Sequence, residues 1–345
     1  MKLLNDILTK KTIIYVMTRL FDIAEKIKAE NVELSILRVL KKISMVSDVN
    51  TKQIGKCTFV PFRDTDQDIF NSNDIIYDIF NADIKQLNKL CILIGYLDGY
   101  TKDEGVCFEI GYAYGMNAPI VSIITDFIRH DFKSPYDGNE HNLDIILEKL
   151  ITKKIVNYKL STAKPTFLKN LHESQRVTHE KLEIYLYELF REYIPKERNL
   201  NITKNIDVYI DFGGGLFEWQ RQFQNKLADI FKNASISFSL SMRYYSHGIE
   251  KDIGNLADAD IKNMLNSNVI IICADNTEMD SGSAALQGLA YSANKKIILY
   301  DTKNTDITGD NQYRSSRNLM ITCSATSVIN SFDDILEGVR LLITK

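Results

Sequence analysis

The sequence has few of the features that mark a secreted, membrane or metal-binding protein. Its 345 residues contain five cysteines, an odd number, and no two of them form a CxxC pair. This pattern favours neither a zinc module nor a disulfide scaffold. The amino terminus lacks the long apolar core of a signal peptide, and no run approaches the length of a membrane span. We therefore expect a reduced, cytoplasmic protein without a metal or another cofactor.

A basic surface is also missing. The formal net charge is −3, so the sequence offers no electrostatic footprint for nucleic acid, and nucleic acid is not expected as a partner. Hydrophobic residues make up 45% of the chain and charged residues 25%, which are ordinary values for a globular protein. A chain of this length has room for two domains, each with its own core.

The chain contains an acidic segment with spaced glycines at residues 103–114, and residues 280–291 repeat this segment without gaps. The second copy has Leu286 where Glu109 stands in the first. The repeat keeps its spacing but loses one carboxylate, which suggests that both copies have the same fold and that only the first copy carries the chemistry. The matching pairs are Ala82–Lys85 with Ala259–Lys262, Asp103 with Asp280, Gly105 with Gly282, Gly111 with Gly288, Ala113 with Ala290, and Tyr114 with Tyr291.

Both copies predict the same order of strands and helices. Short runs rich in β-branched residues predict strands, and amphipathic or small-residue stretches predict helices. Strands that are apolar on both faces and alternate with helices indicate a parallel sheet covered on both sides, so the fold class is α/β with two doubly wound domains in tandem. The expected strands are 12–17, 90–96 and 119–124, then 206–212, 269–274 and 296–300; the expected helices are roughly 20–45 and 105–116, then 216–232 and 282–293, with further helices ending near Leu90 and Leu265.

A polar stretch at roughly 165–193 separates the copies and has a strong helical pattern. We interpret this helix as the closing element of the first domain, although packing between the domains is an alternative. The predicted domains are 1–200 and 201–345. The first domain is longer, which predicts an inserted loop in 46–75 near the site. The apolar face of the separating helix contains Leu182, Tyr185, Leu186, Leu189 and Phe190.

Asp103 and Glu109 span the turn after an expected strand, at the carboxyl end where parallel sheets bind ligands, and Asp83 lies on the helix before that strand. Three acids from separate elements can thus converge in a crevice. Gly105 gives the turn before Glu109 its backbone freedom. Since no Cys or His cluster lies nearby, the pattern favours carboxylate chemistry of the glycosidase type. Surface acids and helix caps are the alternative for each acid taken alone.

The string Leu97-Asp98-Gly99 followed by Asp103 through Ala113 resembles the signature of the nucleoside 2-deoxyribosyltransferases. The resemblance covers most of 12–146 and, more weakly, 206–322. It implies a flavodoxin-like sandwich and transfer of 2-deoxyribose between nucleobases, with deoxynucleosides and free bases as partners.

The resemblance also implies roles for individual residues. Glu109 would be the nucleophile at C1′, Tyr15 would orient it, and Asp83 with Asp103 would bind and protonate the departing base. Phe21 and Gly105 would contact the substrate. Core packing is the alternative for Tyr15 and Phe21.

The second copy keeps Tyr209, Phe217, Asp260 and Asp280 but has Leu286 at the nucleophile position, so we expect it not to form the ester. Gln287 is one helical step away and should not replace Glu109. The glycines at 213–215 are more typical of a permissive turn than of a phosphate loop.

One further feature of the second copy is family-like: Asn318, followed by Leu319 and Met320. The resemblance implies that such a segment reaches into a neighbouring pocket. We therefore expect the domains to pair as an intramolecular pseudo-dimer, with Asn318 and Met320 completing the Glu109 site and Asn142 facing the second pocket. An ordinary loop is the alternative, and association of whole chains is left open.

Two other functions remain open at this point. One is hydrolysis by a deoxynucleoside or deoxynucleotide N-glycosidase, in which Arg19 would serve a 5′-phosphate. The other is a nucleoside-binding regulatory protein. A purely structural second domain is compatible with each of them.

Overall fold

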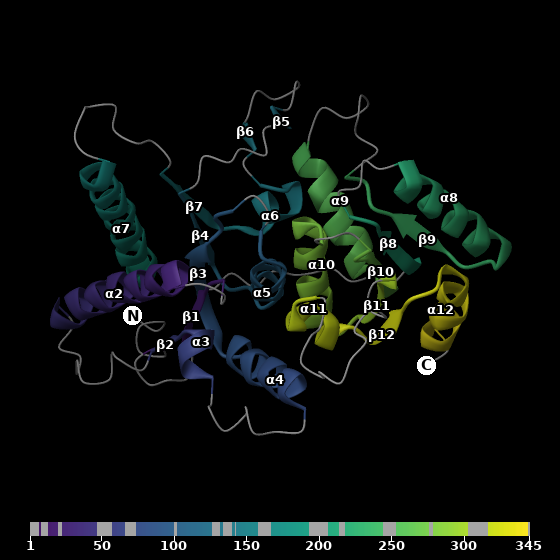
Figure 1. The fold of residues 1–345 in the computed structure, drawn as a ribbon, viewed down its shortest axis with the longest axis horizontal. Coiled ribbons are helices and arrows are strands. Elements are labelled where there is room, and N and C mark those ends of the chain that lie inside the picture. Colours follow the sequence, from purple (N-terminus) through teal and green to yellow (C-terminus); the bar gives the residue numbers. More distant parts are fainter. Residues whose placement is uncertain are drawn as a thin grey trace.

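The chain forms two α/β domains in tandem (Figure 1). The computed structural model describes residues 7, 13–19, 23–46, 57–65, 74–99, 102–125, 132–133, 140–141, 143–157, 167–192, 206–213, 218–243, 253–275, 279–302 and 317–343. Each domain is built on a five-stranded parallel sheet with helices on both faces. The predicted fold class is therefore confirmed.

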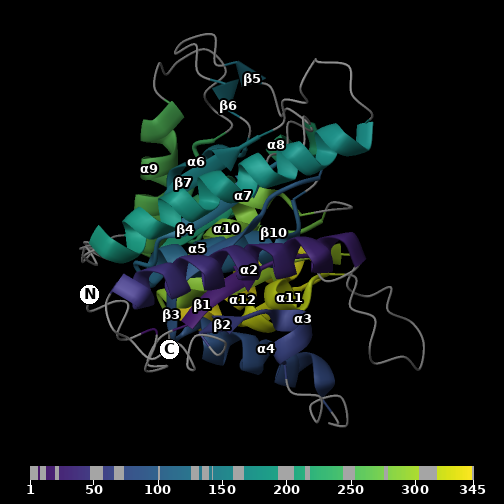
Figure 2. The ribbon, with the colours of Figure 1, turned by 90° about the vertical axis from the view of Figure 1, so that its left-hand side faces the viewer.

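The first sheet has the strand order β2-β1-β3-β4-β7. Figure 2 shows α2 and α7 covering its outer face. The other face carries α4, α5 and α6, which lie toward the second domain. The elements are β1 (Ile13–Met17), α2 (Ile23–Val46), β2 (Thr58–Phe59), α3 (Pro61–Asp64), α4 (Ile75–Leu87), β3 (Leu90–Tyr96), α5 (Glu104–Gly115), β4 (Ile120–Ile124), α6 (Ile145–Leu150), β7 (Lys153–Val156) and α7 (Phe167–Glu192).

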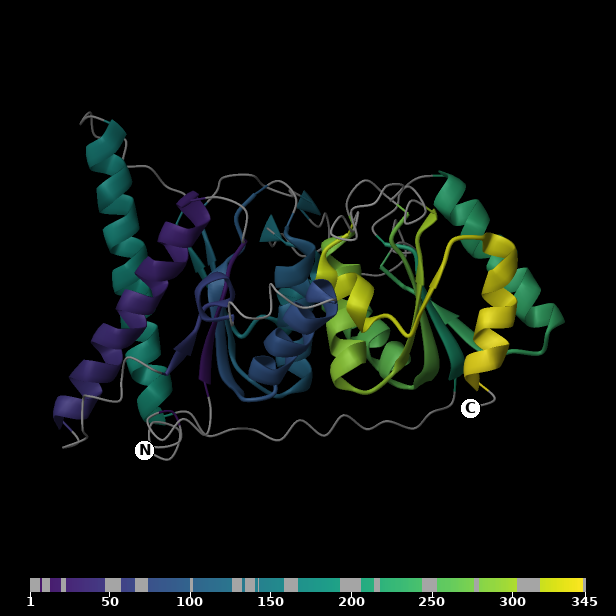
Figure 3. The ribbon, with the colours of Figure 1, turned by 60° about the horizontal axis from the view of Figure 1, so that its bottom comes forward.

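The second sheet has the order β12-β11-β10-β8-β9, which is the order of the first sheet written from its opposite edge. Helices α8 and α12 cover its outer face, and α9, α10 and α11 face the first domain (Figure 3). A small antiparallel pair, β5 (Phe132–Lys133) with β6 (Glu140–His141), stands apart from both sheets. The elements are β8 (Ile206–Asp211), α8 (Glu218–Asn233), β9 (Phe238–Leu240), α9 (Ile253–Leu265), β10 (Ser267–Cys273), α10 (Ser281–Ser292), β11 (Lys296–Tyr300), α11 (Leu319–Ser324), β12 (Ser327–Ile329) and α12 (Ile335–Ile343).

Alternation along the strands divides the interior into three cores. In β1, Ile14 and Val16 pack in the core beneath α2 and α7, whereas Tyr15 points to the opposite face. That opposite face joins the inner face of the second sheet in one shared core, and a third core lies beneath α8 and α12. Because successive side chains of a strand point to opposite faces, the apolar runs of both sheets supply two cores at once.

The two domains meet where α5 crosses α10. A methyl group added at Gly111 of α5 would lie 1.7 Å from the carbonyl oxygen of Ala285, and one added at Gly288 of α10 would lie 1.9 Å from the carbonyl oxygen of Phe108. In the sequence repeat, Gly111 corresponds to Gly288 and Phe108 corresponds to Ala285. The crossing therefore has the reciprocal contacts of a two-fold interface, and glycine is required there for close backbone approach.

The expected elements agree with the observed ones to within a few residues. Helix α7 lies on α2 and β7, on the side of the first sheet away from the second domain. Its predicted apolar face is confirmed, because Leu182, Leu186 and Phe190 are buried in the outer core. Of the predicted insertion, β2 and α3 lie within the described residues.

Candidate active site

Asp103 begins the helix that presents Glu109. Its Oδ1 accepts the amide hydrogen of Val106 at 3.0 Å, so it is the N-cap of α5. A carboxylate at this position satisfies an otherwise unpaired amide and opposes the positive end of the helix dipole. The helix is buried almost all round, because it lies between its own sheet and α10. This arrangement places Glu109 in the interior instead of on a solvated helix face.

Tyr15 of β1 holds Glu109 directly. The tyrosine hydroxyl donates a hydrogen bond of 2.7 Å to Glu109 Oε1, and both side chains are buried. Phe59 of the neighbouring strand β2 packs against the tyrosine ring with a centroid separation of 5.2 Å. The phenol therefore has a fixed position, and one carboxylate oxygen of Glu109 is held by it.

Asp83 of α4 is buried, as Glu109 is, and completes the cluster that we call the first site: Tyr15, Asp83, Asp103 and Glu109. Among the described residues, Asp83 Oδ1 and Glu109 Oε2 are buried without a hydrogen-bond partner. Unpaired buried polar atoms are rare in folded proteins and require a reason. In the first site they provide two acceptor positions on separate helices that a ligand could use.

Burial raises the pKa of these acids. It raises the pKa of Asp83 to about 7, against the opposing effect of the Thr65 hydroxyl. It also raises the pKa of Glu109 well above the usual range; the Tyr15 hydrogen bond opposes this rise, and the charges of Asp83 and Asp103 add to it. The pKa of Asp103 is raised by burial as well, although the amide of Val106 and the charge of Arg19 lower it. Groups with such perturbed pKa values are typical of functional sites.

The second domain contributes Asn318 to this region. Asn318 is the N-cap of α11, and its Oδ1 accepts from the amide of Met320 at 2.9 Å. A methyl group added at Gly105 would lie 2.6 Å from Asn318 Nδ2, so the asparagine side chain rests on the first turn of α5. Met320 follows it and is buried in the core shared by the two domains. Gly105, Asn318 and the Asp103 cap therefore lie together.

The corresponding second pocket contains Tyr209, Asp260, Asp280 and Leu286. Asp280 is the N-cap of α10, as Asp103 is of α5. Asp260 is fully buried and accepts from the Ser241 hydroxyl at 3.0 Å and the Met242 amide at 2.7 Å. Leu286 is fully buried at the position that Glu109 has in the first site.

Sequence reasoning missed Arg243, which lies at the centre of the second pocket. Its Nη2 donates to both carboxylate oxygens of Asp211, at 2.8 and 2.7 Å, and its Nη1 donates to Asp280 Oδ1 at 2.8 Å. The Arg243 side chain is 1% exposed. Burial alone would raise the pKa of Asp280, but the charge of Arg243 lowers it below the usual value. No local sequence motif surrounds Arg243, so its place in the second pocket could be recognised only from the fold.

The first domain also reaches into the second pocket, through Asp144. Asp144 is the N-cap of α6, and its Oδ2 accepts from Arg243 Nη1 at 3.1 Å. A methyl group added at Gly282 would lie 2.2 Å from Asp144 Oδ1, just as Gly105 lies against Asn318. Asp144 is therefore the structural counterpart of Asn318. Asn142, which was expected to face this pocket, lies outside the described residues, as do Phe21 and Phe217.

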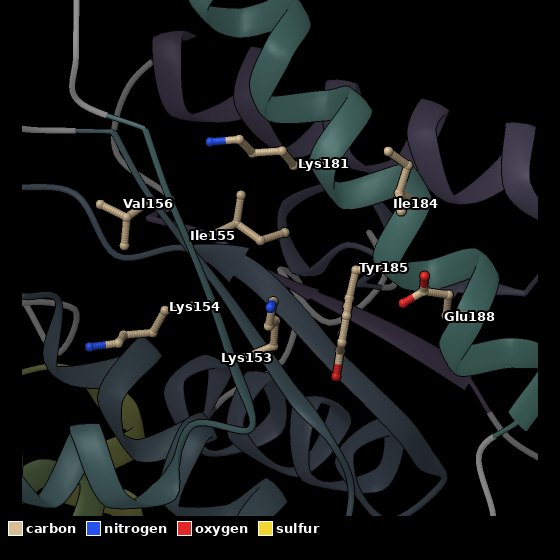
Figure 4. A pocket seen from close by; sticks show the side chains of 8 residues that line it. All are labelled: Lys153, Lys154, Ile155, Val156, Lys181, Ile184, Tyr185 and Glu188. Atoms are coloured by element: carbon tan, nitrogen blue, oxygen red, sulfur yellow. The ribbon is translucent and has the colours of Figure 1, made fainter.

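A groove of about 330 Å³ lies elsewhere, between β7 and α7 (Figure 4). Its wall includes Lys153, Lys154 and Lys181, with Tyr185 and Glu188 from α7. Lys154 is paired with Glu148, and Lys153 lies 5.5 Å above the Tyr185 ring. Since α7 covers the outer face of the sheet and Glu109 lies on α5 beneath the inner face, the groove is separate from the first site.

In the part of the chain that the structure describes, no group of three or more His, Cys, Asp or Glu side chains is arranged to hold a metal ion. Across the same ranges, none of the helices has both the length and the apolar character needed to span a bilayer.

Similarity to known proteins comes from a family model. No curated protein matches the sequence significantly. The family model described as nucleoside 2-deoxyribosyltransferase matches residues 43–146, a range that contains Asp83, Asp103 and Glu109. Tyr15 and Asn318 lie outside it, and the weaker resemblance of 206–322 stays a prediction. The resemblance to the nucleoside 2-deoxyribosyltransferases is thus confirmed over 43–146, and it supports a glycosyl or deoxyribosyl transfer function and nucleoside substrates in general.

Proposed function

We propose that the protein exchanges the base of 2′-deoxynucleosides by two displacements at C1′. In the first, a Glu109 carboxylate oxygen attacks C1′, the glycosidic bond breaks, and the base departs with a proton from the neighbouring acids. In the second, an incoming base nitrogen attacks the deoxyribosyl ester, loses its proton to the same acids and releases Glu109. Two inversions retain the β configuration.

The observation that carries this proposal is the state of the Glu109 carboxylate. One oxygen accepts from Tyr15, and the other is buried without a partner among the described residues. A nucleophile needs such an arrangement: one oxygen fixed and one presented to the reacting carbon. The deoxyribosyl cation that forms as the base departs lacks the electron-withdrawing 2-hydroxyl, so the glycosidic bond of a deoxynucleoside is comparatively labile. A placed carboxylate and an acid are then sufficient to break this bond.

The raised pKa values fit a division of roles between the acids. A pKa of about 7 keeps much of Asp83 protonated near neutral pH, as a proton donor to a departing base requires. Burial is the main cause of the raised pKa of Glu109, and the Tyr15 hydrogen bond opposes it by favouring the ionised carboxylate. In this proposal Glu109 reacts in that ionised form, and Asp83 is the proton donor. Asp103, at the start of α5, is the second contact for the base.

The second domain, in this proposal, is a structural partner and not a second enzyme. Its pocket has Leu286 in place of the glutamate, and Arg243 there binds the carboxylates of Asp211 and Asp280. The domain instead contributes Asn318 and Met320 to the first site. The five cysteines are free thiols, which fits a reducing cytoplasm, and base exchange among deoxynucleosides is salvage chemistry.

The test is incubation of the protein with thymidine or deoxyadenosine and a second free base, followed by chromatography. Transfer yields the new deoxynucleoside, and Glu109→Ala and Glu109→Gln should each abolish it. A Leu286→Met variant is the matched control and should keep activity, because it leaves an apolar side chain of similar volume at the corresponding buried position. Release of base and free sugar without a new nucleoside would establish a hydrolase instead. Unchanged turnover in Glu109→Ala would overturn the assigned nucleophile, and binding without turnover in the wild type would favour a regulatory protein.

A further inference from the structure

We propose that Glu104 and Arg317 form a latch between the domains that positions Asn318 at the first site. This inference rests on the proposed function, because it assigns Glu104 and Arg317 a part in catalysis through Asn318. Neither residue belongs to the first site itself.

Glu104 receives hydrogen bonds from three groups of the second domain. Its Oε1 accepts from the amide of Met279 at 2.8 Å and from Arg317 Nη1 at 3.3 Å, and its Oε2 accepts from the amide of Asn318 at 3.3 Å. The Glu104 side chain is 14% exposed and that of Arg317 is 2% exposed. Charge-assisted bonds of this kind are little screened away from water and fix geometry as well as adding energy. Glu104 therefore joins the first turn of α5 to two segments of the second domain, the residues before α10 and the Arg317–Asn318 pair.

Arg317 is anchored a second time within its own domain. Its Nε donates to Asp301 Oδ2 at 3.1 Å, and Asp301 is fully buried directly after β11. The guanidinium thus bridges a carboxylate of the second sheet and a carboxylate of α5. Such a bridge leaves the peptide between Arg317 and Asn318 little freedom to rotate.

The side chain of Asn318 is oriented by the same segment. Its Oδ1 accepts from the Met320 amide, which directs Nδ2 away from α11, and the amide group rests on Gly105. Gly105 lies two residues after Asp103 and four before Glu109. The latch therefore sets where the Asn318 amide meets the start of α5, beside two proposed catalytic acids.

The latch is present on one side of the pseudo-two-fold interface only. The sequence repeat places Ser281 opposite Glu104, and the cap of the other short helix is Asp144 instead of Asn318. At that side Asp144 is bound by Arg243 within the second pocket. The Glu104 carboxylate thus lies on the side of the interface that has Glu109, as expected for a contact that supports the first site.

The test is a double-mutant cycle for base exchange. Glu104→Gln keeps the shape but removes the charge, and we expect it to lower kcat/KM about 10-fold, as expected for a loss of about 1.4 kcal/mol. Asn318→Ala should lower kcat/KM as well, and the double variant should be no slower than Asn318→Ala alone. Arg317→Lys should retain more activity than Arg317→Met. If the two effects multiply, Glu104 does not act through Asn318 and the proposal is wrong.

A matched control removes another interdomain carboxylate. Asp258 of α9 pairs with Lys149 of α6 at 2.6 Å on the exposed side of the interface. Asp258→Asn should leave kcat/KM within about 2-fold of the wild type, because exposed pairs contribute little. An equal loss in Asp258→Asn and Glu104→Gln would mean that any interface charge matters, and it would overturn the latch.

A second readout does not depend on activity. Amide hydrogen exchange over residues 318–324 should speed up at least 5-fold in Glu104→Gln and stay unchanged in Glu109→Ala. Unchanged exchange in Glu104→Gln would refute the latch even if base exchange occurs. If the wild type transfers no base but exchange responds as expected, the proposed function fails while the positioning of Asn318 by Glu104 stands.

Discussion

Tyr15 and Glu109 are 94 residues apart in the chain, yet the tyrosine hydroxyl donates a 2.7 Å hydrogen bond to Glu109 Oε1. The bond joins β1 to α5 across the inner face of the first sheet. It connects the one tyrosine of the first site with the carboxylate that the second copy lacks, and so it is the first target for mutation.

Tyr15→Phe keeps the aromatic ring in the core and removes the hydroxyl. A hydrogen bond to a charged group is worth about 1.5–3 kcal/mol, so we expect kcat/KM for base exchange to fall about 10- to 100-fold. Steady-state kinetics with a deoxynucleoside and a free base measure the loss. Tyr209→Phe in the second pocket is the control and should change kcat/KM by less than about 2-fold. Equal activity of Tyr15→Phe and the wild type would remove Tyr15 from the mechanism.

Asp83→Asn should change how stability depends on pH. The pKa of Asp83 is raised from 3.8 to about 7, so between these values the folded protein holds a proton that the unfolded chain releases. Stability from this group is therefore present below pH 4 and lost as pH rises toward 7. Asparagine carries no proton to lose. Relative to wild type, the variant should gain about 1–3 kcal/mol of unfolding free energy between pH 5 and pH 8. Urea denaturation at both pH values measures this gain, and a pH-independent difference would contradict it.

Gly111→Ala should disrupt the helix crossing between the domains. Its new methyl group would meet the backbone oxygen of Ala285, which cannot rotate away, so we expect a loss of about 3 kcal/mol or more in unfolding free energy. Gly338→Ala in α12 is the matched control, because the nearest atom to its methyl group would be the end of the flexible Ile329 side chain, and no backbone atom lies among its nearest contacts. The control should lie within about 1 kcal/mol of the wild type. Similar stabilities for both variants would mean that the crossing tolerates a wider separation.

Arg243→Met should be strongly destabilising. It leaves Asp211 and Asp280 buried without their counter-charge, and breaking such a buried pair costs about 3–5 kcal/mol. The loss should be smaller at pH 5 than at pH 8, because burial raises the pKa of Asp280 once the charge of Arg243 no longer lowers it, and Asp280 then binds a proton as pH falls. Arg176→Met, which breaks exposed pairs with Glu173 and Glu180, should have no measurable effect. A loss in Arg243→Met that is the same at both pH values would indicate lost packing instead of unpaired charge.

The elements around both acidic segments follow from local pattern. The apolar runs of β3 and β10 and the capped helices α5 and α10 differ from the predicted ranges by at most two residues. Their signals are short-range: β-branched runs, an aspartate cap and glycine spacing. The short outer strands β7 and β12 were not predicted, because four and three residues carry too little periodicity.

The charged contacts across the two domains were beyond sequence reasoning. Arg243 lies 99 residues from Asp144 and 32 from Asp211, and no spacing rule connects them. Asn142 was the residue expected at the second pocket, whereas helix capping selects Asp144 as the counterpart of Asn318. Glu104 lies within the acidic motif, but its bonds to Met279 and Arg317 depend on how the domains pack.

The reciprocal crossing of α5 and α10 has a consequence for how the two sites can change. In an assembly of identical subunits, one codon change alters both sides of a two-fold interface together. In this chain, positions 104 and 281 are separate codons, and so are 144 and 318. One side could therefore acquire the glutamate and the asparagine while the other acquired an aspartate bound to arginine, and neither change had to be tolerated twice.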